Sequence, residues 1–362
     1  MTLNIALHHR FPEFTLDLAF TAPAGVTALF GRSGSGKTTV INAVAGLLRP
    51  DQGQVQLDGV TLTDTRQGIS LPPHRRRIGY VFQDARLFPH LTVRQNLLYG
   101  RWFAPKTAGP DLGRIVDLLG IGPLLNRRPG ALSGGEKQRV AIGRAILSNP
   151  RLLAMDEPLA ALDEARKAEI LPYLQLLRDE LHLPILYVSH AMAEVARLAN
   201  TVVLLEAGRV MAVGPAAEVL SDPVTAPLLG LREVGALLTA RVAAQDSDGL
   251  TRLDTAAGPI WLPQITAPLG KSLRVRILAQ DVMLATARPE GISALNILPA
   301  TVRDIRLGDG PGALVRLDLG AEAMLVRITR RSAEALALAP GLPVFAVLKA
   351  VSVAQENVGG GP

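Results

Sequence analysis

Two hydrophobic patterns divide the chain. In the first two thirds, short apolar runs rich in strand-forming residues, such as 25–30 and 151–155, alternate with stretches of helical spacing. In the last third, short strands of alternating apolar and polar residues are separated by Gly, Asp and Pro. The first pattern predicts an α/β domain over residues 1–230. The second predicts a small all-β, OB-like barrel over residues 231–362.

The apolar strand at 25–30 leads into a glycine-rich loop and then a helix. Residues 31–39 read GRSGSGKTT, and VINAVAGLL follows with helical spacing. In this setting the pattern G-x-x-x-x-G-K-[ST] predicts a phosphate-binding loop. The glycines let consecutive N–H groups point at phosphate oxygens, and the helix N-terminus adds partial positive charge. An ordinary glycine-rich turn is the weaker alternative.

The side chains of this loop have separate expected roles. Lys37 can reach the β and γ phosphates of a nucleotide, the Thr38 hydroxyl can ligate Mg²⁺, and Thr39 can contact the α phosphate. The candidate ATP-binding residues of the loop are Gly31, Arg32, Ser33, Gly34, Ser35, Gly36, Lys37, Thr38 and Thr39.

A second apolar strand, at 151–155, ends in two carboxylates. The carboxyl end of such a strand is where an open parallel sheet binds ligands. We expect Asp156 to hold the Mg²⁺ shell and Glu157 to polarise the attacking water, because phosphoryl transfer is catalysed mainly by positioning and charge stabilisation. A solvated strand end is the competing interpretation. It is weaker for two consecutive acids that precede Pro158.

Between these motifs, residues 132–136 read LSGGE and precede an apolar helix. A serine before two glycines at a helix start offers a hydroxyl, free backbone N–H groups and a helix dipole to an anion. A second phosphate-binding turn acting on the nucleotide of the same chain would be redundant. This motif therefore indicates a nucleotide bound elsewhere.

With these motifs in this order, the first 230 residues or so resemble the ATP-binding subunits of ABC transporters. The resemblance implies a P-loop NTPase fold, with a RecA-like core and a helical subdomain at about 84–150. It also implies ATP hydrolysis by a head-to-tail homodimer, in which the 132–136 motif of one chain closes over ATP bound by the other.

The resemblance extends to further site residues. Gln83 matches the glutamine that contacts Mg²⁺ and the attacking water, and His190 matches the switch histidine. Asp163 lies in a segment similar to the D-loop, although Ala160 stands where the family often has Ser. The implied catalytic residues are Glu157, His190 and Gln83. The implied Mg²⁺ ligands are Thr38, Gln83 and Asp156. The implied ATP contacts outside the loop are Ser133, Gly134, Gly135, Glu136 and Asp163.

The family usually stacks the adenine on an aromatic residue upstream of the loop. Phe11 and Phe14 are the two candidates, with a slight preference for Phe11, and either could instead belong to the core. The apolar segment 87–97, which follows Gln83, is open to two interpretations. It can pack the helical subdomain, or it can form a cleft for a helix of a membrane-spanning permease subunit.

The last third of the chain narrows the resemblance. Residues 293–298 (SALNIL) are similar to the opening of the molybdate-binding Mop, or TOBE-type, domain, whose expected extent is about 291–355. Ser293 and Lys349 are the implied oxyanion ligands, but Leu295 stands where the family pattern has Arg. Binding of molybdate as a regulatory ligand and a purely structural barrel both remain open.

The resemblance as a whole implies a motor for molybdate import, with a periplasmic molybdate-binding protein delivering the ion. Alternatives are the same role for sulfate, polyamine, iron or sugar, or a soluble ABC-type ATPase. The soluble type is disfavoured because the chain has one ATPase cassette and no sustained heptads.

Composition adds exclusions. The chain has no cysteine, which excludes disulfides and thiolate metal sites. Its net charge of +6 is too small to indicate a nucleic-acid partner. Residues 1–10 lack a signal-peptide pattern, and the longest uncharged apolar stretch, 335–348, is broken by prolines and too short to span a bilayer. We therefore expect a peripheral protein, held by permease subunits at the cytoplasmic face of the inner membrane.

Overall fold

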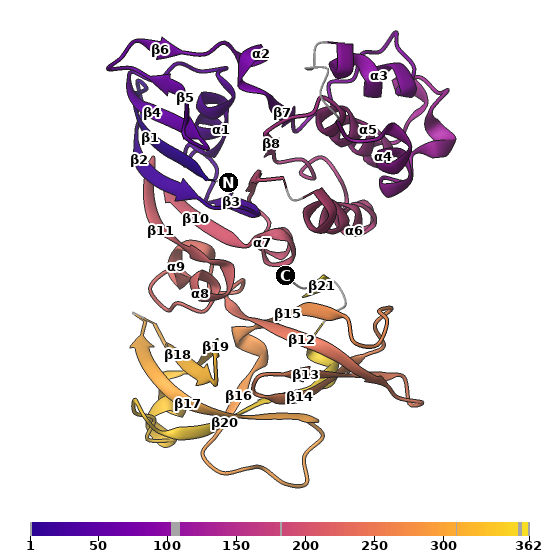
Figure 1. Cartoon of the computed structure of the whole chain (residues 1–362). Helices are drawn as coiled ribbons and strands as arrows, with labels where there is room; N and C mark the ends of the chain where they lie inside the picture. The colour runs from indigo at the N-terminus through magenta and orange to yellow at the C-terminus, as the bar shows by residue number, and fades with distance from the viewer. Residues whose placement is uncertain (1, 103–108, 182, 309, 354–356, 361–362) are drawn as a thin grey trace. The chain divides into compact units, whose positions relative to one another are not determined.

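The computed structural model describes residues 2–102, 109–181, 183–308, 310–353 and 357–360 (Figure 1). The chain forms two compact units, Met1–Val213 and Gly214–Pro362. The expected division after residue 230 differs from this one. The short helices α8 (Ala216–Leu220) and α9 (Ala226–Leu229) fall in the second unit, where α8 packs against strands β12 and β19.

The first unit is built on a six-stranded sheet of order β11-β10-β3-β9-β8-β7. Pairing is parallel from β10 through β3, β9 and β8 to β7. Every residue of β3 and β9 is buried, which explains their continuous apolar runs. The strands are β3 (Val26–Phe30), β7 (Ile78–Val81), β8 (Leu152–Asp156), β9 (Ile185–Ser189), β10 (Thr201–Glu206) and β11 (Arg209–Pro215).

A second, antiparallel sheet of order β2-β1-β4-β5-β6 belongs to the same unit. Burial alternates residue by residue along β2, so the apolar side chains lie on one face. They share a core with apolar residues of α1 (Lys37–Ala45), β3 and β9. The strands are β1 (Leu3–Arg10), β2 (Thr15–Ala22), β4 (Gln52–Leu57), β5 (Val60–Asp64) and β6 (Ile69–Ser70).

Helices form a further layer of the first unit, drawn in purple and magenta in Figure 1. Three of them, α3 (Val93–Tyr99), α4 (Leu112–Leu118) and α5 (Gly134–Leu147), fall in the range expected for the helical subdomain. They share a core with α6 (Glu164–Leu181). The remaining α-helices of the unit are α2 (Pro73–Arg76) and α7 (Met192–Leu198), and α7 packs on β3 and β9. No helix in the described part of the chain is long and apolar enough to cross a membrane.

The second unit is a ten-stranded sheet of order β14-β13-β12-β19-β18-β17-β20-β16, with β15 on β12 and β21 on β15. The long strands β12 and β17 each contain a register shift in their pairing, and the sheet encloses one apolar core. The strands are β12 (Gly235–Gln245), β13 (Leu250–Thr255), β14 (Gly258–Pro263), β15 (Ser272–Leu278), β16 (Met283–Ala285), β17 (Asn296–Leu307), β18 (Gly312–Leu319), β19 (Glu322–Thr329), β20 (Pro343–Leu348) and β21 (Val358–Gly360). Helix α10 (Arg330–Ala335) follows β19.

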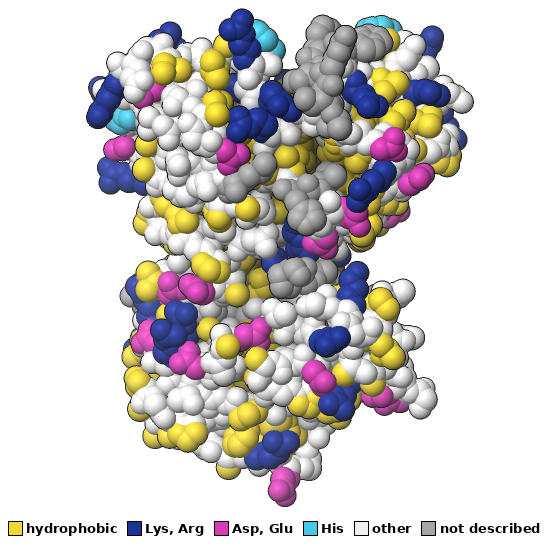
Figure 2. All heavy atoms as spheres, viewed as in Figure 1, with side chains coloured by type: hydrophobic (Ala, Val, Ile, Leu, Met, Phe, Trp, Pro, Cys, Tyr) yellow, Lys and Arg dark blue, Asp and Glu magenta, His cyan; other side chains and the backbone are white. Residues whose placement is uncertain are grey.

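The mean hydropathy of +0.25 is accounted for by these interiors. On the face seen in Figure 2, charged side chains of both signs are scattered among the hydrophobic ones over each unit. Three of the exposed large apolar residues, Leu47, Val224 and Leu269, lie far apart in the sequence, in turns or bends outside the helices and strands. The aliphatic composition therefore serves the cores.

Candidate nucleotide-binding site

The glycine-rich loop joins β3 to α1 as the sequence predicts. Gly34 and Gly36 have φ values of 81° and 98°, a conformation that favours glycine. A Cβ atom at Gly31 would lie 2.2 Å from the carbonyl oxygen of Leu205, and one at Gly36 would lie 2.7 Å from Leu16 Cδ1. The carbonyl of Leu205 therefore requires glycine at position 31, and the positive φ favours glycine at position 36, so the two ends of the loop can make its tight turn.

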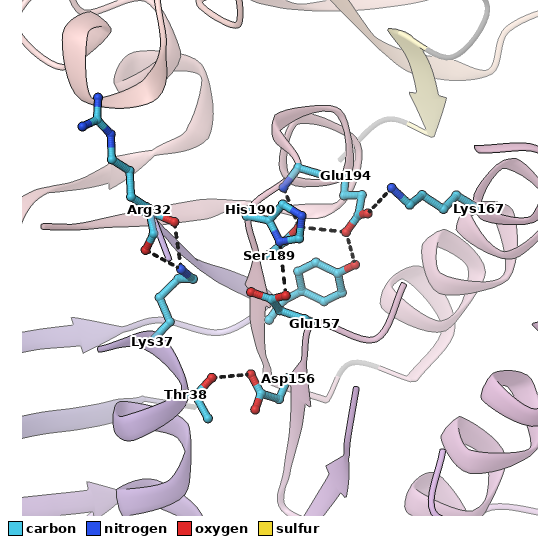
Figure 3. A network of polar contacts seen from close by, with 12 residues as sticks. Arg32, Lys37, Thr38, Asp156, Glu157, Lys167, Ser189, His190 and Glu194 are labelled. Carbon is cyan, nitrogen blue, oxygen red and sulfur yellow. Dashed lines mark hydrogen bonds and ion pairs between the residues drawn. The ribbon is translucent and has the colours of Figure 1, made fainter. Parts of the chain in front are cut away.

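Lys37, the first residue of α1, is only 5% exposed. Its Nζ donates hydrogen bonds to the carbonyl oxygens of Gly31 and Arg32, at 2.8 and 2.9 Å (Figure 3). Burial lowers the pKa of Lys37, while the charges of Glu157 and Asp156 act to raise it. The structure thus holds a buried cation against the loop, within electrostatic reach of both carboxylates.

Asp156 lies at the carboxyl end of β8, beside the start of α1. Thr38 Oγ1 donates to Asp156 Oδ1 at 3.1 Å, and the Tyr80 hydroxyl lies 3.3 Å from Asp156 Oδ2 and 2.9 Å from Asn42 Oδ1. Burial raises the pKa of Asp156, and the bonds from Thr38 and Tyr80 partly offset that effect. Tyr80 is a site residue that no sequence motif identifies, and it reaches the site from the neighbouring strand β7.

The pair of Thr38 and Asp156 fits a Mg²⁺ ion that accompanies a nucleotide. Mg²⁺ in phosphate sites takes one or two protein oxygens together with phosphate oxygens and water. Over the residues that the structure describes, no group of three or more His, Cys, Asp or Glu side chains could hold a metal by itself. The hydroxyl and the carboxylate are 3.1 Å apart, so both would be in reach of one bound ion.

Glu157 and His190 meet at the ends of neighbouring strands. The Glu157 N–H donates to the carbonyl oxygen of Val188 at 3.0 Å, which ties the end of β8 to β9. Glu157 has a φ of 45°, an unusual left-handed conformation for a residue with a side chain. His190 Nδ1 lies 3.2 Å from Glu157 Oε2 (Figure 3). Gln83, which follows β7 by two residues, is exposed at the same edge of the sheet.

The 132–136 motif forms the start of helix α5. Ser133 is its N-cap: the Ser133 hydroxyl accepts from the Glu136 N–H at 3.2 Å, and Glu136 Oε2 accepts from the Ser133 N–H at 2.7 Å. That bond is the largest cause lowering the pKa of Glu136. Asp163 likewise accepts from the Arg166 N–H, at 2.9 Å, at the start of α6. Within the described residues, no hydrogen bond or ion pair joins Ser133, Gly134, Gly135, Glu136 or Asp163 to loop 31–39 of this chain.

Phe11 and Phe14 stack on each other beside the loop. Their ring centroids are 4.9 Å apart and their planes differ by 4°. Phe14 lies against the loop, since its Cε2 would be 3.6 Å from a Cβ atom at Gly36. The His9 ring meets Phe11 edge-on at 4.5 Å. The two stacked rings therefore extend away from the phosphate loop: Phe14 lies next to the loop, and Phe11 stacks on Phe14.

In the second unit, Ser293 and Lys349 are exposed near one end of the β17–β20 ladder. The ladder begins with Asn296 opposite Leu348, so Leu295 and Lys349 lie one residue beyond that end. Asn296 is fully buried, and its amide exchanges hydrogen bonds with the backbone of Trp261 at 2.7 and 2.9 Å. This asparagine therefore links β17 to β14.

Comparison with known proteins agrees with these features. Residues 16–160 match the ABC transporter family model, and residues 292–355 match the TOBE domain model. The solved structure of cbiO1 from Clostridium perfringens, part of the ABC transporter complex cbiONQ, is similar with a TM-score of 0.52 and 28% identity, covering 61% of this chain and 90% of that one. The chain is thus an ABC-type ATPase with a C-terminal TOBE domain, which confirms the predicted fold class.

Curated relatives define the group more closely. The chain is 56% identical over 355 residues to the molybdenum import ATP-binding protein ModC of Rhizobium etli, covering 98% of this chain and 99% of the relative. It is 54% identical over 363 residues to the protein of the same name from Mesorhizobium japonicum, covering 100% and 98%. The chain belongs to the family of molybdenum import ATP-binding proteins.

Proposed function

We propose that this chain hydrolyses ATP to drive molybdate import, as the ATP-binding subunit of an ABC importer. The observation that carries the proposal is the convergence of Lys37, Thr38, Asp156, Glu157 and His190 at one edge of the parallel sheet. The cargo is inferred from relatives that are named for molybdenum import and match nearly the full chain.

Different residues of the chain bind the nucleotide, hold the metal ion and position the attacking water. The loop N–H groups and Lys37 bind the phosphates, with phosphate oxygens replacing the carbonyls of Gly31 and Arg32 as partners of the Lys37 amine. Thr38, Asp156 and Gln83 hold Mg²⁺, which when bound neutralises phosphate charge. Glu157 orients the attacking water, and His190 holds Glu157 and senses the γ phosphate. Phe11 stacks on the adenine.

A complete site takes a second copy of the chain. Ser133, Gly134, Gly135, Glu136 and Asp163 contact the ATP held by the loop of the opposite subunit. The capping box already orients the α5 N-terminus, whose remaining N–H groups suit a phosphate. The permease subunits dock on the segment that follows Gln83, where Arg144 donates to the carbonyl oxygens of Ala85 and Arg86 at 3.1 and 2.9 Å. The dimer therefore lies on the cytoplasmic face of the inner membrane, and a periplasmic molybdate-binding protein supplies the cargo.

Mixed dimers test this arrangement. A Lys37→Met chain and a Ser133→Arg chain should each be inactive as homodimers. A mixed dimer, isolated with two different tags, should regain hydrolysis because one of its two sites combines the intact loop of one chain with the intact motif of the other. No recovery in the mixed dimer would show that the two motifs do not act across subunits. Uptake of labelled molybdate into vesicles containing the full importer, with sulfate as competitor, tests the cargo.

Molybdate is also proposed as a regulatory ligand of the second unit, at Ser293 and Lys349. Both side chains are exposed near one end of the β17–β20 ladder, and a hydroxyl and an ammonium suit a tetrahedral dianion. Equilibrium binding of molybdate to the full chain should weaken in Lys349→Ala and strengthen in Leu295→Arg, which restores the cation of the family pattern. Equal binding by both variants and the parent would leave the barrel as a structural module.

A further inference from the structure

A buried carboxylate lies behind the pair of Glu157 and His190. Glu194, on helix α7, is 4% exposed. Its Oε2 accepts hydrogen bonds from the Tyr187 hydroxyl at 2.7 Å and from the Ser189 hydroxyl at 2.8 Å, while its Oε1 lies 3.9 Å from Lys167 Nζ (Figure 3). Glu194 belongs to none of the sequence motifs and has no part in the roles proposed for ATP hydrolysis.

Two hydroxyls and an ammonium group surround the Glu194 carboxylate. Burial raises the pKa of Tyr187 well above its usual value, and the nearby charge of Glu194 adds to this effect. The phenol therefore stays protonated and donates to the carboxylate. With two hydroxyl donors on one oxygen and an ammonium near the other, Glu194 has the partners of a buried anion. Burying a polar side chain is costly unless it is hydrogen-bonded, so the position of Glu194 at this point of the fold calls for a reason.

The carboxylate fixes the backbone on both sides of His190. The Ser189 hydroxyl, which donates to Glu194, also accepts from the Ala191 N–H at 3.0 Å. The Ser189 side chain thus links the Glu194 carboxylate to the backbone of the turn from β9 to α7, which contains His190. The His190 side chain itself is 56% exposed, so its direction depends on this turn and on its contact with Glu157.

The same carboxylate is linked to α6. Lys167, whose side chain is only 15% exposed, follows Asp163 by one helical turn, and its N–H donates to the Asp163 carbonyl at 2.9 Å. Its Nζ lies 2.8 Å from Glu164 Oε1 and 3.9 Å from Glu194 Oε1. The first turn of α6, where the proposed dimer contact at Asp163 lies, therefore shares a charge network with the His190 turn.

We infer that Glu194 is a positioning residue for ATP hydrolysis, which sets the β9–α7 turn so that His190 faces Glu157. The inference rests on the proposed function. Glu194 acts through His190, since its Oε2 is bonded to Tyr187 and Ser189 and its Oε1 lies near Lys167. A purely structural role would lower stability whether or not His190 is present. A positioning role loses its effect on hydrolysis once His190 is removed.

A double-mutant cycle in the full-length protein separates these two roles. Glu194→Gln should lower kcat for ATP by about tenfold, with KM and the equilibrium affinity for ATP changed by less than about twofold. In the His190→Ala background, the same change should lower the residual single-turnover rate by less than about twofold. Glu164→Gln is the matched control, because this exposed carboxylate bonds the same Lys167, and it should leave kcat unchanged.

An equal fold loss of rate from Glu194→Gln in both backgrounds would overturn the inference, as would an unchanged kcat in the single variant. If thermal unfolding shows that Glu194→Gln does not fold, Ser189→Ala takes its place in the cycle, since it removes only the hydroxyl that links Glu194 to the turn. Normal hydrolysis by His190→Ala would contradict the proposed role of His190 itself and would remove the basis of the inference. This outcome differs from an equal loss of rate in both backgrounds, which would contradict only the role of Glu194.

Discussion

His190 Nδ1 lies 3.2 Å from Glu157 Oε2, which joins the carboxyl ends of two neighbouring buried strands. The contact is made by a glutamate at a φ of 45°, a conformation that costs a residue with a side chain roughly 1–2 kcal/mol. Surrounding structure holds it there through the bond from the Glu157 N–H to Val188. Strain of this kind, retained where two polar side chains meet, is typical of a functional site.

The phosphate loop should depend on the Lys37 amine. Lys37→Met removes the buried cation and should weaken ATP binding by about 100-fold, because a charge-assisted bond to phosphate is lost in a partly desolvated site. Equilibrium titration with a fluorescent ATP analogue measures the change. Lys271→Met, an exposed lysine of the second unit, is the control and should bind like the parent. Parent-like binding by Lys37→Met would place the phosphates elsewhere.

ATP hydrolysis should need a higher Mg²⁺ concentration at acidic pH than at neutral pH. Burial raises the pKa of Asp156, so its protonated form persists to higher pH than in an ordinary aspartate, and only the ionised form ligates a metal. The Mg²⁺ concentration for half-maximal hydrolysis should be constant above the raised pKa and increase by up to about tenfold per pH unit below it.

Magnesium titrations between about pH 5 and pH 8 check this expectation. ATP's own protonation acts equally on all variants, so the informative quantity is the difference between them. Asp156→Asn should need more Mg²⁺ throughout and lose the extra acid-side dependence. Asp281→Asn removes a carboxyl whose pKa is also raised by burial, but in the second unit, and should keep the parent profile. The same acid-side slope in Asp156→Asn would exclude this carboxylate as the titrating ligand.

The local motifs of the ATP site could be predicted because each is contained in a short segment. A strand, a glycine-rich loop and a helix specify the phosphate loop, and an apolar strand places Asp156 and Glu157 at its end. The role of Glu194 could not be predicted in this way. Its partner Tyr187 lies seven residues away on β9, and only the packing of α7 on that strand brings the two together.

In the second unit, the sequence predicts the strands but not the hydrogen-bond partner of Asn296. The alternating apolar and polar positions predict a small all-β barrel, and the structure forms this part of the chain into a ten-stranded sheet with one apolar core. The segment 293–298 is similar to the opening of a molybdate-binding domain, with Ser293 as the expected ligand within it. Asn296 of the same segment instead bonds the Trp261 backbone, 35 residues away. A short motif predicts residue types, whereas the choice between a ligand contact and an internal hydrogen bond depends on the tertiary neighbours.

Removing that link should destabilise the second unit. Asn296→Ala leaves the Trp261 N–H and carbonyl without their partner and should lower the free energy of unfolding by about 2 kcal/mol. Because the chain has only two tryptophans, Trp261 fluorescence in a Trp102→Phe background reports the unfolding of this unit alone in urea. Thr301→Ala, at an exposed position of the same strand, is the control. An unchanged urea midpoint in Asn296→Ala would mean that the two bonds add no net stability.

The central claim is that Glu157 activates water for hydrolysis of ATP held by the loop 31–39. Glu157→Gln keeps the size of the side chain and removes its charge, so ATP affinity should stay within about threefold of the parent while kcat falls by at least about 100-fold. Paired measurements of ATP binding and phosphate release on one preparation, with and without the permease subunits, test this most directly. Tight binding with lost turnover is the predicted result. Near-normal phosphate release by Glu157→Gln would contradict the account.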